Sequence, residues 1–196
     1  MGPVNINDQC PKLAIFISGR GSNFQSIHRA IQSGELVASI ALVVSDRRAE
    51  GLAYANAHNL PFIMCQRCDY ETQLEHEADV LKHCKHAGID WIVLAGYMRI
   101  LSAQFLAQYP EKVVNIHPSL LPKFKGLHPQ RQALSSGETE SGCTVHYVIP
   151  DVDSGPIILQ RRVPIYAGDT EAQLSARILH EEHTAYVAAL NTVLGE

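Results

Sequence analysis

The fold is decided by residues 13–45, which read LAIFISGRGSNFQSIHRAIQSGELVASIALVVS. The stretch opens and closes on short apolar runs, 13–18 and 39–45, which are typical of buried strands. Between them, residues 22–33 place Phe24, Ile27 and Ile31 at helical spacing, and Gly34 ends the pattern. The stretch therefore predicts a strand–helix–strand unit, in which the two strands are parallel.

The same alternation continues towards the C-terminus. Further elements are expected at 50–58 (helix), 62–65 (strand), 69–87 (helix), 90–95 (strand), 102–109 (helix, capped by Ser102) and 112–116 (strand). In the long helix, Leu74, Ala78 and Leu81 are predicted to face the core. This order favours an α/β fold with a mostly parallel twisted sheet and helices on both faces.

The pattern changes after residue 116. Residues 117–142 are rich in Pro, Gly, Ser and Lys, with a short helix expected at 130–135. Two β segments, 144–149 and 156–165, then flank a turn and predict an antiparallel end to the sheet. A final helix starts near Thr170 and turns Leu174, Ile178 and Leu179 inward. We expect one domain over residues 12–196, preceded by a short extension at 1–11.

Composition excludes several classes of protein. The 196 residues carry 16 Lys and Arg against 20 Asp and Glu, a net charge of −4, which argues against binding nucleic acid through charge. The longest apolar run, residues 91–98, is too short to span a bilayer. The first dozen residues are polar and unlike a secretory signal, and the five cysteines are an odd number. These features predict a cytoplasmic protein with reduced thiols.

Two groups of metal-binding residue types occur outside the features developed below. Cys65 and Cys68 have the spacing of a redox motif, but no second such pair follows. His76, His83 and His86 share one predicted helix, and we interpret them as part of a solvated helix face.

The turn after the first strand, SGRGSN at 18–23, favours an anion. Glycine permits a tight turn, and the helix that follows offers free N–H groups at the positive end of its dipole. Gly21, Ser22 and Asn23 are the candidate phosphate ligands, whereas the alternative is a capped turn without a ligand. Phe24 occupies the third glycine position of the dinucleotide fingerprint, so an NADP enzyme using Arg47 is only the second choice.

A second polar group follows the strand at 112–116. Asn115 and His117 project on the same side of the chain at the carboxyl end of a strand, where open α/β sheets bind ligands. Asp151 or Asp153, in the later turn, can pair with His117 and raise its pKa, and the pattern does not separate the two. Asn and protonated His can stabilise a developing oxyanion, which suits acyl transfer directly to an amine.

Seven blocks together resemble the phosphoribosylglycinamide formyltransferase family. They are SGRGSN (18–23), LAGYMRIL (94–101), NIHPSLLP (115–122), GLHPQRQAL (126–134), GCTVHYV (142–148), DVDSGPIILQ (151–160) and VPIYAGDT (163–170). The resemblance implies transfer of a formyl group from 10-formyltetrahydrofolate to the glycine amine of 5-phosphoribosylglycinamide, in de novo purine biosynthesis, with no metal. The partners implied are these small molecules, with neither nucleic acid nor membrane, and the chain is expected to be a monomer or homodimer.

The resemblance also implies roles for individual residues. The catalytic group would be Asn115, His117 and Asp153, with Asp153 rather than Asp151 keeping His117 protonated. Gly21, Ser22, Asn23, Leu179 and Glu182 would contact the ribonucleotide. The folate would lie against Met98, Arg99, Ile100, Leu101, Asn115, Ile149, Pro150, Asp151, Val152 and Asp153. In one departure, no arginine stands at 69–73, where family members often carry one that contacts the folate.

Other readings compete with this one. Methionyl-tRNA formyltransferase shares the Asn, His and Asp residues but is expected to carry a further C-terminal domain and a basic surface. Formyltetrahydrofolate hydrolase shares them too and is expected to carry an N-terminal regulatory domain. An NADP oxidoreductase or a phosphate-binding module without catalysis would explain only the glycine turn.

Overall fold

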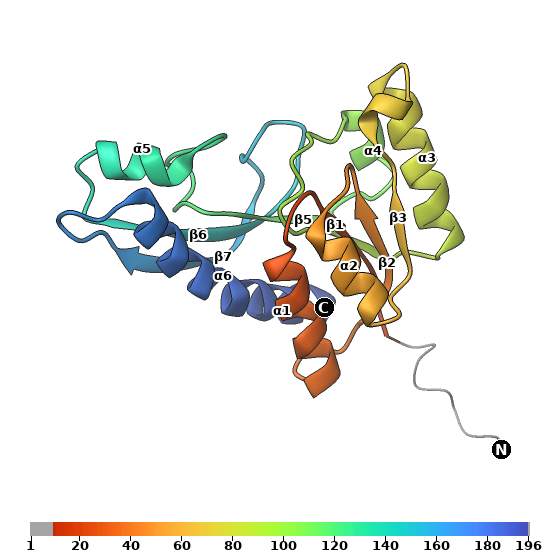
Figure 1. Cartoon of the computed structure of the whole chain (residues 1–196), viewed down its shortest axis with the longest axis horizontal. Coiled ribbons are helices and arrows are strands. Elements are labelled where there is room, and N and C mark those ends of the chain that lie inside the picture. The colour runs from red at the N-terminus through yellow and green to blue at the C-terminus, as the bar shows by residue number, and fades with distance from the viewer. Residues whose placement is uncertain (1–9, 196) are drawn as a thin grey trace.

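The computed structural model describes residues 10–195 and contains a seven-stranded sheet with helices on both faces (Figure 1). The strands are β1 (Lys12–Ile17), β2 (Ser39–Ser45), β3 (Phe62–Met64), β4 (Trp91–Leu94), β5 (Val113–His117), β6 (Glu140–Tyr147) and β7 (Ile157–Pro164). The helices are α1 (Ser22–Ser33), α2 (Glu50–Ala57), the short 3-10 helix η2 (Arg67–Asp69), α3 (Gln73–His86), α4 (Ala103–Leu106), α5 (Pro129–Ser135) and α6 (Glu171–Leu194).

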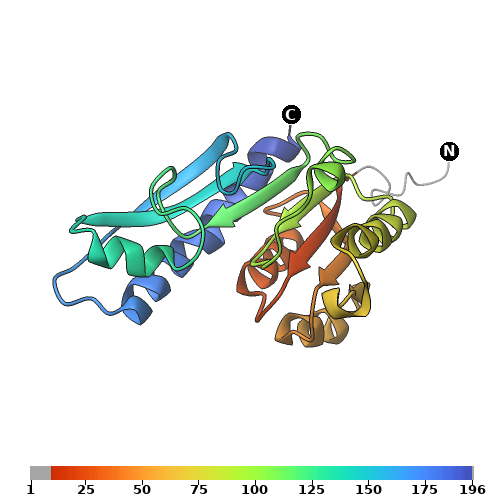
Figure 2. The ribbon, with the colours of Figure 1, turned by 90° about the horizontal axis from the view of Figure 1, so that it is seen from above.

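The sheet is parallel in its first part and antiparallel at its end, as the sequence predicts. Its strand order is β3-β2-β1-β4-β5-β6-β7, with parallel pairing from β3 to β5. β6 and β7 add antiparallel to β5 and form the long hairpin that extends to one side (Figure 2). The strand order reverses between β1 and β4, and such a switch point opens a crevice at the carboxyl ends of the strands.

Two apolar cores hold the helices on the sheet. One core lies under α1, α2, α5 and α6 and includes Phe24 and Ile178, while the other lies under α3 and α4 and includes Val80 and Phe105. The fully buried Tyr186 of α6 donates its hydroxyl to the carbonyls of Leu94, at 2.9 Å, and Val114, at 3.1 Å. This contact fixes α6 against the ends of β4 and β5, beside the switch point.

The third helix corrects one prediction. Residues 69–87 do not form one continuous helix, because η2 ends at Asp69 and α3 starts only at Gln73, after a capping box between Thr72 and Glu75. The core-facing side of α3 also differs. Leu74 is exposed and Ala78 faces solvent, whereas His76, Glu77, Val80 and Cys84 are buried.

The predicted core-facing side of α3 is wrong for Leu74 and Ala78, whereas Leu81 does pack against the core. The interpretation of His76 as part of a solvated helix face is also wrong, because His76 is buried. His76 Nε2 donates to the carbonyl of Cys65 at 2.9 Å, and Glu77 accepts hydrogen bonds from the backbone and hydroxyl of Ser102. These bonds compensate for burying polar groups, so a side of the helix that looks hydrophilic in sequence lies inward.

Most other boundaries agree to within a few residues. α1 and β2 match the expected ranges, α6 starts after its cap Thr170, and Ser102 caps a helix, α4, that is shorter than expected. In α6, Leu174 and Ile178 are fully buried and Leu179 is half-buried. Most of the expected extension at 1–11 lies outside the described residues. Within residues 10–195, no helix combines the length and the apolar character needed to cross a bilayer.

Candidate active site

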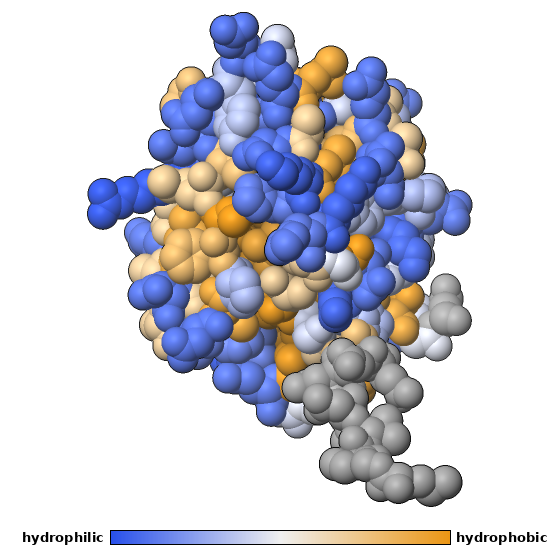
Figure 3. Space-filling model, turned by 90° about the vertical axis from the view of Figure 1, so that its right-hand side faces the viewer, coloured by the Kyte–Doolittle hydropathy of each residue, from blue (hydrophilic) through white to orange (hydrophobic). Residues whose placement is uncertain are grey.

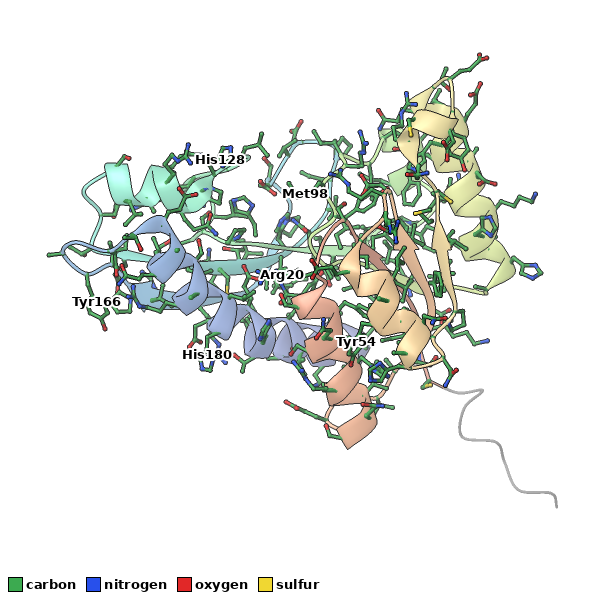
Figure 4. All side chains as sticks on the ribbon, in the orientation of Figure 1. Arg20, Tyr54, Met98, His128, Tyr166 and His180 are labelled. Atoms are coloured by element: carbon green, nitrogen blue, oxygen red, sulfur yellow. The ribbon has the colours of Figure 1, made fainter. Side chains whose placement is uncertain are left out.

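A cavity of about 620 Å³ lies where β1, β4 and β5 end, and it brings together most of the predicted site residues. Those that line it are Asn23, Met98, Arg99, Ile100, Leu101, Asn115, His117, Ile149, Pro150, Asp151, Val152, Asp153 and Glu182. Met98 and His128, two lining residues, are labelled in Figure 4, where Arg20 marks the glycine turn at the start of α1. Gly21, Ser22 and Leu179 are predicted site residues that do not line the cavity.

His117 and Asp153 form a nearly buried pair in this cavity. His117 Nδ1 lies 3.2 Å from Asp153 Oδ2, and about nine-tenths of each side chain is shielded from solvent. His117 therefore pairs with Asp153, whereas Asp151 is exposed. The backbone N–H of Gly126 donates to Asp153 Oδ2 at 2.9 Å and fixes the carboxylate from its other side.

A tight turn holds Asp153 in place. Its φ of 47° lies in the left-handed region, which costs a non-glycine residue free energy and is often found at functional sites. Gly155 makes the turn possible, since a Cβ there would lie 1.8 Å from the carbonyl oxygen of Tyr147. The turn therefore packs directly on the end of β6 and carries Asp153 over His117.

Both ring nitrogens of His117 face oxygen acceptors. Nε2 donates to the carbonyl of Phe124 at 2.9 Å, and Nδ1 faces the carboxylate of Asp153. This arrangement suits the doubly protonated ring, in which both nitrogens can donate.

Burial opposes the charge on His117 more strongly than Asp153 supports it. Burial lowers the pKa of His117 below its usual value, although the Phe124 carbonyl and the Asp153 carboxylate both act to raise it. The expected effect of a neighbouring carboxylate, which is to raise the pKa of His117, is present at Asp153, but burial outweighs it. For Asp153, burial raises the pKa, but hydrogen bonds from His146 and Gly126, with the charge of His117, bring it below its usual value.

His146 is the residue of this group that the sequence did not reveal. It is almost fully buried; its Nε2 lies 3.2 Å from Asn115 Nδ2 and 3.6 Å from Asp153 Oδ1, and its Nδ1 donates to the carbonyl of Tyr147 at 2.9 Å. Antiparallel pairing of β5 with β6 sets Asn115 directly opposite His146. The strand register was needed to find this contact, and the sequence does not give it.

The glycine turn has the geometry expected of an anion site. Gly21 precedes α1 with a φ of 72°, in the left-handed region, and no side chain caps the helix. No capping side chain therefore accepts a hydrogen bond from the first N–H groups of α1, and the positive end of the helix dipole lies at Ser22.

The glycine turn also connects to α6. Asn23 Nδ2 donates to Glu182 Oε2 at 2.8 Å, and both residues are buried and line the cavity. Burial raises the pKa of Glu182, and the hydrogen bond from Asn23 only partly opposes this. Asn23 Oδ1 is among the buried polar atoms of the described chain without a hydrogen-bond partner. A ligand that donates a hydrogen bond at this wall would satisfy it.

Apolar residues and exposed backbone occupy the other side of the cavity. Met98 is 62% exposed and Ile100 is 66% exposed, while Leu101 is buried. Arg99 is turned towards the buried carboxylate of Asp46, with Nε 2.9 Å from Oδ2. This wall has the mixed character of a pocket for a flat, polar heterocycle.

The structure also describes the region that lacks the expected arginine. Gln73, the first residue of α3, donates to the carbonyl of Ile100 at 2.9 Å. Arg67 donates instead to the carbonyls of Tyr70 and Glu71, and therefore points into its own loop.

The alternative of an NADP enzyme loses support. Arg47, the candidate for an NADP phosphate, makes two hydrogen bonds to Asp46, at 3.1 and 2.7 Å, and is engaged by that carboxylate. A second cavity, of about 860 Å³, is larger and lies around Trp91, Pro110 and Lys112 at the opposite edge of the sheet. No histidine lines it, so chemistry and not volume identifies the candidate site.

The chain is similar to known formyltransferases over most of its length. The family model described as formyl transferase matches residues 11–190. The chain is 45% identical over 182 residues to the trifunctional purine biosynthetic protein adenosine-3 of Drosophila pseudoobscura, but spans only 13% of that protein's length. It is 39% identical over 181 residues to the phosphoribosylglycinamide formyltransferase of Escherichia coli. The aligned region covers 89% of this chain and 82% of that relative.

Solved structures give the same answer. The structure resembles glycinamide ribonucleotide transformylase 1 from Geobacillus kaustophilus with a TM-score of 0.92 and 43% identity, covering 95% of this chain and 100% of that one. A formyltetrahydrofolate deformylase from Pseudomonas syringae is similar with a TM-score of 0.88 and 28% identity, covering 96% of this chain and 63% of that one. The chain therefore belongs to the formyl transferase family, and within it groups with the phosphoribosylglycinamide formyltransferases.

Proposed function

We propose that this chain transfers the formyl group of 10-formyltetrahydrofolate to the glycine amine of 5-phosphoribosylglycinamide, a step of purine biosynthesis. The observation that carries the proposal is the convergence of Asn115, His117 and Asp153 in one cavity at the switch point of the sheet. The family membership and the names of the relatives support it.

The three residues have distinct proposed roles in direct attack by the amine. The amine nitrogen bonds to the formyl carbon, the carbonyl oxygen becomes an oxyanion, and the bond to the folate nitrogen then breaks. Asn115 and protonated His117 donate hydrogen bonds to the oxyanion. His117 gives its proton to the departing folate nitrogen, and the neutral ring then takes up the proton that the attacking amine releases, which restores protonated His117.

The protonation of His117 depends on its neighbours in this scheme. Asp153 faces Nδ1, so Nε2 is the nitrogen that would donate to the substrate. Nε2 would then exchange its hydrogen bond to the Phe124 carbonyl for one to the substrate. Burial holds the pKa of His117 down while Asp153 raises it, so the ring gives up its proton easily yet can still carry one.

The ribonucleotide is proposed to lie along the start of α1 and the facing side of α6. Gly21, Ser22 and Asn23 would hold its phosphate, since the helix N-terminus has no capping side chain. Glu182 would accept hydrogen bonds from the substrate, and the unpartnered Asn23 Oδ1 would gain a donor. Leu179, half-buried and one helical turn before Glu182, would contribute an apolar contact.

The folate is proposed to occupy the opposite wall. Residues 98–101 and 149–153 both line the cavity and would enclose the pterin ring, with backbone groups available to read its edge. Asn115 lies between this wall and the ribonucleotide side. No metal takes part in the proposed reaction. The proposed partners are the two small molecules, and neither nucleic acid nor membranes are among them.

We propose residues 12–196 as the formyltransferase domain, working in the cytoplasm as a monomer or homodimer. Reduced thiols are expected in that compartment.

A spectrophotometric assay tests the proposal. The purified chain is mixed with 5-phosphoribosylglycinamide and 10-formyltetrahydrofolate or its dideaza analogue, and absorbance of the deformylated product is followed. We expect turnover that depends on the ribonucleotide and that is lost in the variant Asn115→Ala. Deformylation without the amine would instead indicate a hydrolase, and folate binding without either reaction would indicate a different amine substrate.

A further inference from the structure

Three residues of metal-binding type meet outside the lining of the candidate active site. Cys65 follows β3, and Asp79 and His83 stand one turn apart on α3. Cys65 Sγ lies 3.8 Å from Asp79 Oδ2, His83 Nε2 lies 3.9 Å from the same oxygen, and all three ligand atoms lie within 4.8 Å of one another. None of the three lines the candidate active site.

The donor set has the chemistry of a zinc-type site. A thiolate, a carboxylate and an imidazole are the three side-chain ligands that Zn²⁺ uses, and two of them are anionic. Bound together, they would balance the charge of a divalent ion. With metal–ligand distances of about 2.0–2.3 Å, tetrahedral ligand atoms lie about 3.3–3.8 Å apart, close to the separations found here.

The surroundings fix two of the ligands and leave the third adjustable. Cys65 is buried, and its carbonyl accepts a hydrogen bond from His76, which holds the end of β3 against α3. The hydroxyl of Tyr70 donates to Asp79 Oδ2 at 2.7 Å and orients the carboxylate, as outer groups do around metal ligands. The side chain of His83 is 43% exposed, so it can turn by the small amount needed to close the site.

We infer that Cys65, Asp79 and His83 bind a divalent transition metal of the Zn²⁺ class, with water completing the coordination. The ion would join the end of β3 to the middle of α3 and close the loop that contains η2. This face of the molecule is open to the solvent and mixes apolar and hydrophilic side chains (Figure 3). The site goes beyond the proposed formyl transfer and would stabilise this part of the fold.

The histidine and cysteine patterns of the sequence only partly anticipate this site. His83 was interpreted as part of a solvated helix face, together with His76 and His86. The thiol of Cys68, the second member of the Cys-x-x-Cys pair, lies 3.7 Å from Asp69 Oδ1 and is exposed. It belongs to a different group of contacts, and Asp79, which joins Cys65 to His83, carries no signal in the sequence.

Cobalt titration tests the inference. Co²⁺ is added to the reduced, chelator-treated full chain, and absorption is recorded in the near ultraviolet and visible. We expect a sulfur-to-cobalt charge-transfer band with tetrahedral d–d bands, both displaced by Zn²⁺. Cys65→Ser should remove the charge-transfer band, and Asp79→Asn and His83→Ala should each weaken binding about tenfold or more. Cys68→Ser and His86→Ala are the matched controls and should bind like the parent.

Thermal unfolding gives an independent readout. Zn²⁺ should raise the midpoint temperature of the parent and of His86→Ala, but not that of His83→Ala, because a ligand that binds the folded chain stabilises it. His83 is partly exposed, so its variant remains informative even where Cys65→Ser fails to fold. The inference is overturned if the parent shows no thiolate band, if Cys65→Ser retains it, or if Cys68→Ser loses it. Formyl transfer plays no part in these readouts.

Discussion

Asp153 Oδ2 lies 3.2 Å from His117 Nδ1, although the whole of α5 and β6 separates the two residues in the sequence. The contact depends on two structural features. β5 ends at His117, next to the end of β4, and the turn before β7 carries Asp153 back over it. The proposed catalytic pair is thus assembled from two segments that neither local propensity nor spacing connects.

Replacing His117 should abolish most of the turnover while leaving the fold intact. In the variant His117→Ala, we expect kcat to fall by about 10²–10⁴-fold, the range typical of losing a general acid. Steady-state kinetics measure the loss, and circular dichroism checks the fold. His86→Ala, which alters an exposed histidine on α3, should keep the parent rate. Retention of more than a few per cent of the rate in His117→Ala would show that another group is the main acid.

Replacing Asp153 should move the pH dependence of the reaction in a defined direction. Burial lowers the pKa of His117 and Asp153 raises it, so Asp153→Asn should lower that pKa further. Protonated His117 is the active form in the proposed mechanism, so activity should fall with rising pH at a lower pH than in the parent. Substrate KM should change little, and kcat should fall.

NMR titration of the His117 ring tests the same effect without turnover. The titration midpoint of Asp153→Asn should lie below that of the parent. The variant Asp151→Asn, which alters an exposed carboxylate in the same turn, should leave the midpoint in place. An identical midpoint in the parent and in Asp153→Asn would refute the electrostatic role.

The sequence predicts the sheet more completely than the site because strands and helices have local signals. Apolar runs, caps and stop residues gave α1 and β2 to the residue. α3 was the exception, since buried His76 and Glu77 satisfy their polar groups through Cys65 and Ser102 and therefore break the apolar periodicity. Such hydrogen bonds form only after the chain has folded.

Candidate site residues at the ends of strands could be predicted from the sequence. Those that are brought together by the pairing register of two strands could not. Asn115 and His117 occupy a strand end, where the fold class itself predicts ligands. His146 lies within β6, and only the antiparallel pairing of β6 with β5 sets it opposite Asn115. Family resemblance was needed to choose Asp153, and no local pattern connects Asp79 to Cys65.

The variant Glu182→Gln should be more stable than the parent and should bind the ribonucleotide more weakly. Burial raises the pKa of Glu182 above its usual value of 4.5, so this residue favours folding most below pH 4.5, and that contribution is lost as pH rises through its folded-state pKa. Glu182 therefore favours folding less at neutral pH than it does below pH 4.5. Glutamine can still accept the Asn23 hydrogen bond and carries no charge, so the variant should be more stable.

Thermal unfolding against pH tests this prediction. The melting temperature of Glu182→Gln should exceed that of the parent at neutral pH, by about 2–4 °C for each kcal/mol gained, and the gap should shrink towards pH 4. The KM for the ribonucleotide should rise in the same variant. A gap that does not vary with pH would mean that the charge of Glu182 is not its cause.

Asp169→Asn should destabilise the start of α6 in a way that depends on pH. Arg177 donates to both carboxylate oxygens of Asp169, at 2.8 and 3.0 Å, and stacks over the ring of Tyr166. The hydrogen bonds from Arg177 lower the pKa of Asp169 from 3.8 to about 2. Because the folded-state pKa is depressed, the stabilisation is complete above pH 3.8 and is lost as pH falls towards 2.

Unfolding of the parent and of Asp169→Asn should therefore differ at neutral pH and converge under acid conditions. Equilibrium denaturation between pH 7 and pH 2 measures the difference, with Asp151→Asn as the control for an exposed aspartate that lacks this arginine pair. High salt should reduce the difference only in part, because the paired hydrogen bonds have a fixed geometry that screening does not remove. A constant difference down to pH 2 would show that the side-chain amide disturbs the turn by its shape and not by the loss of charge.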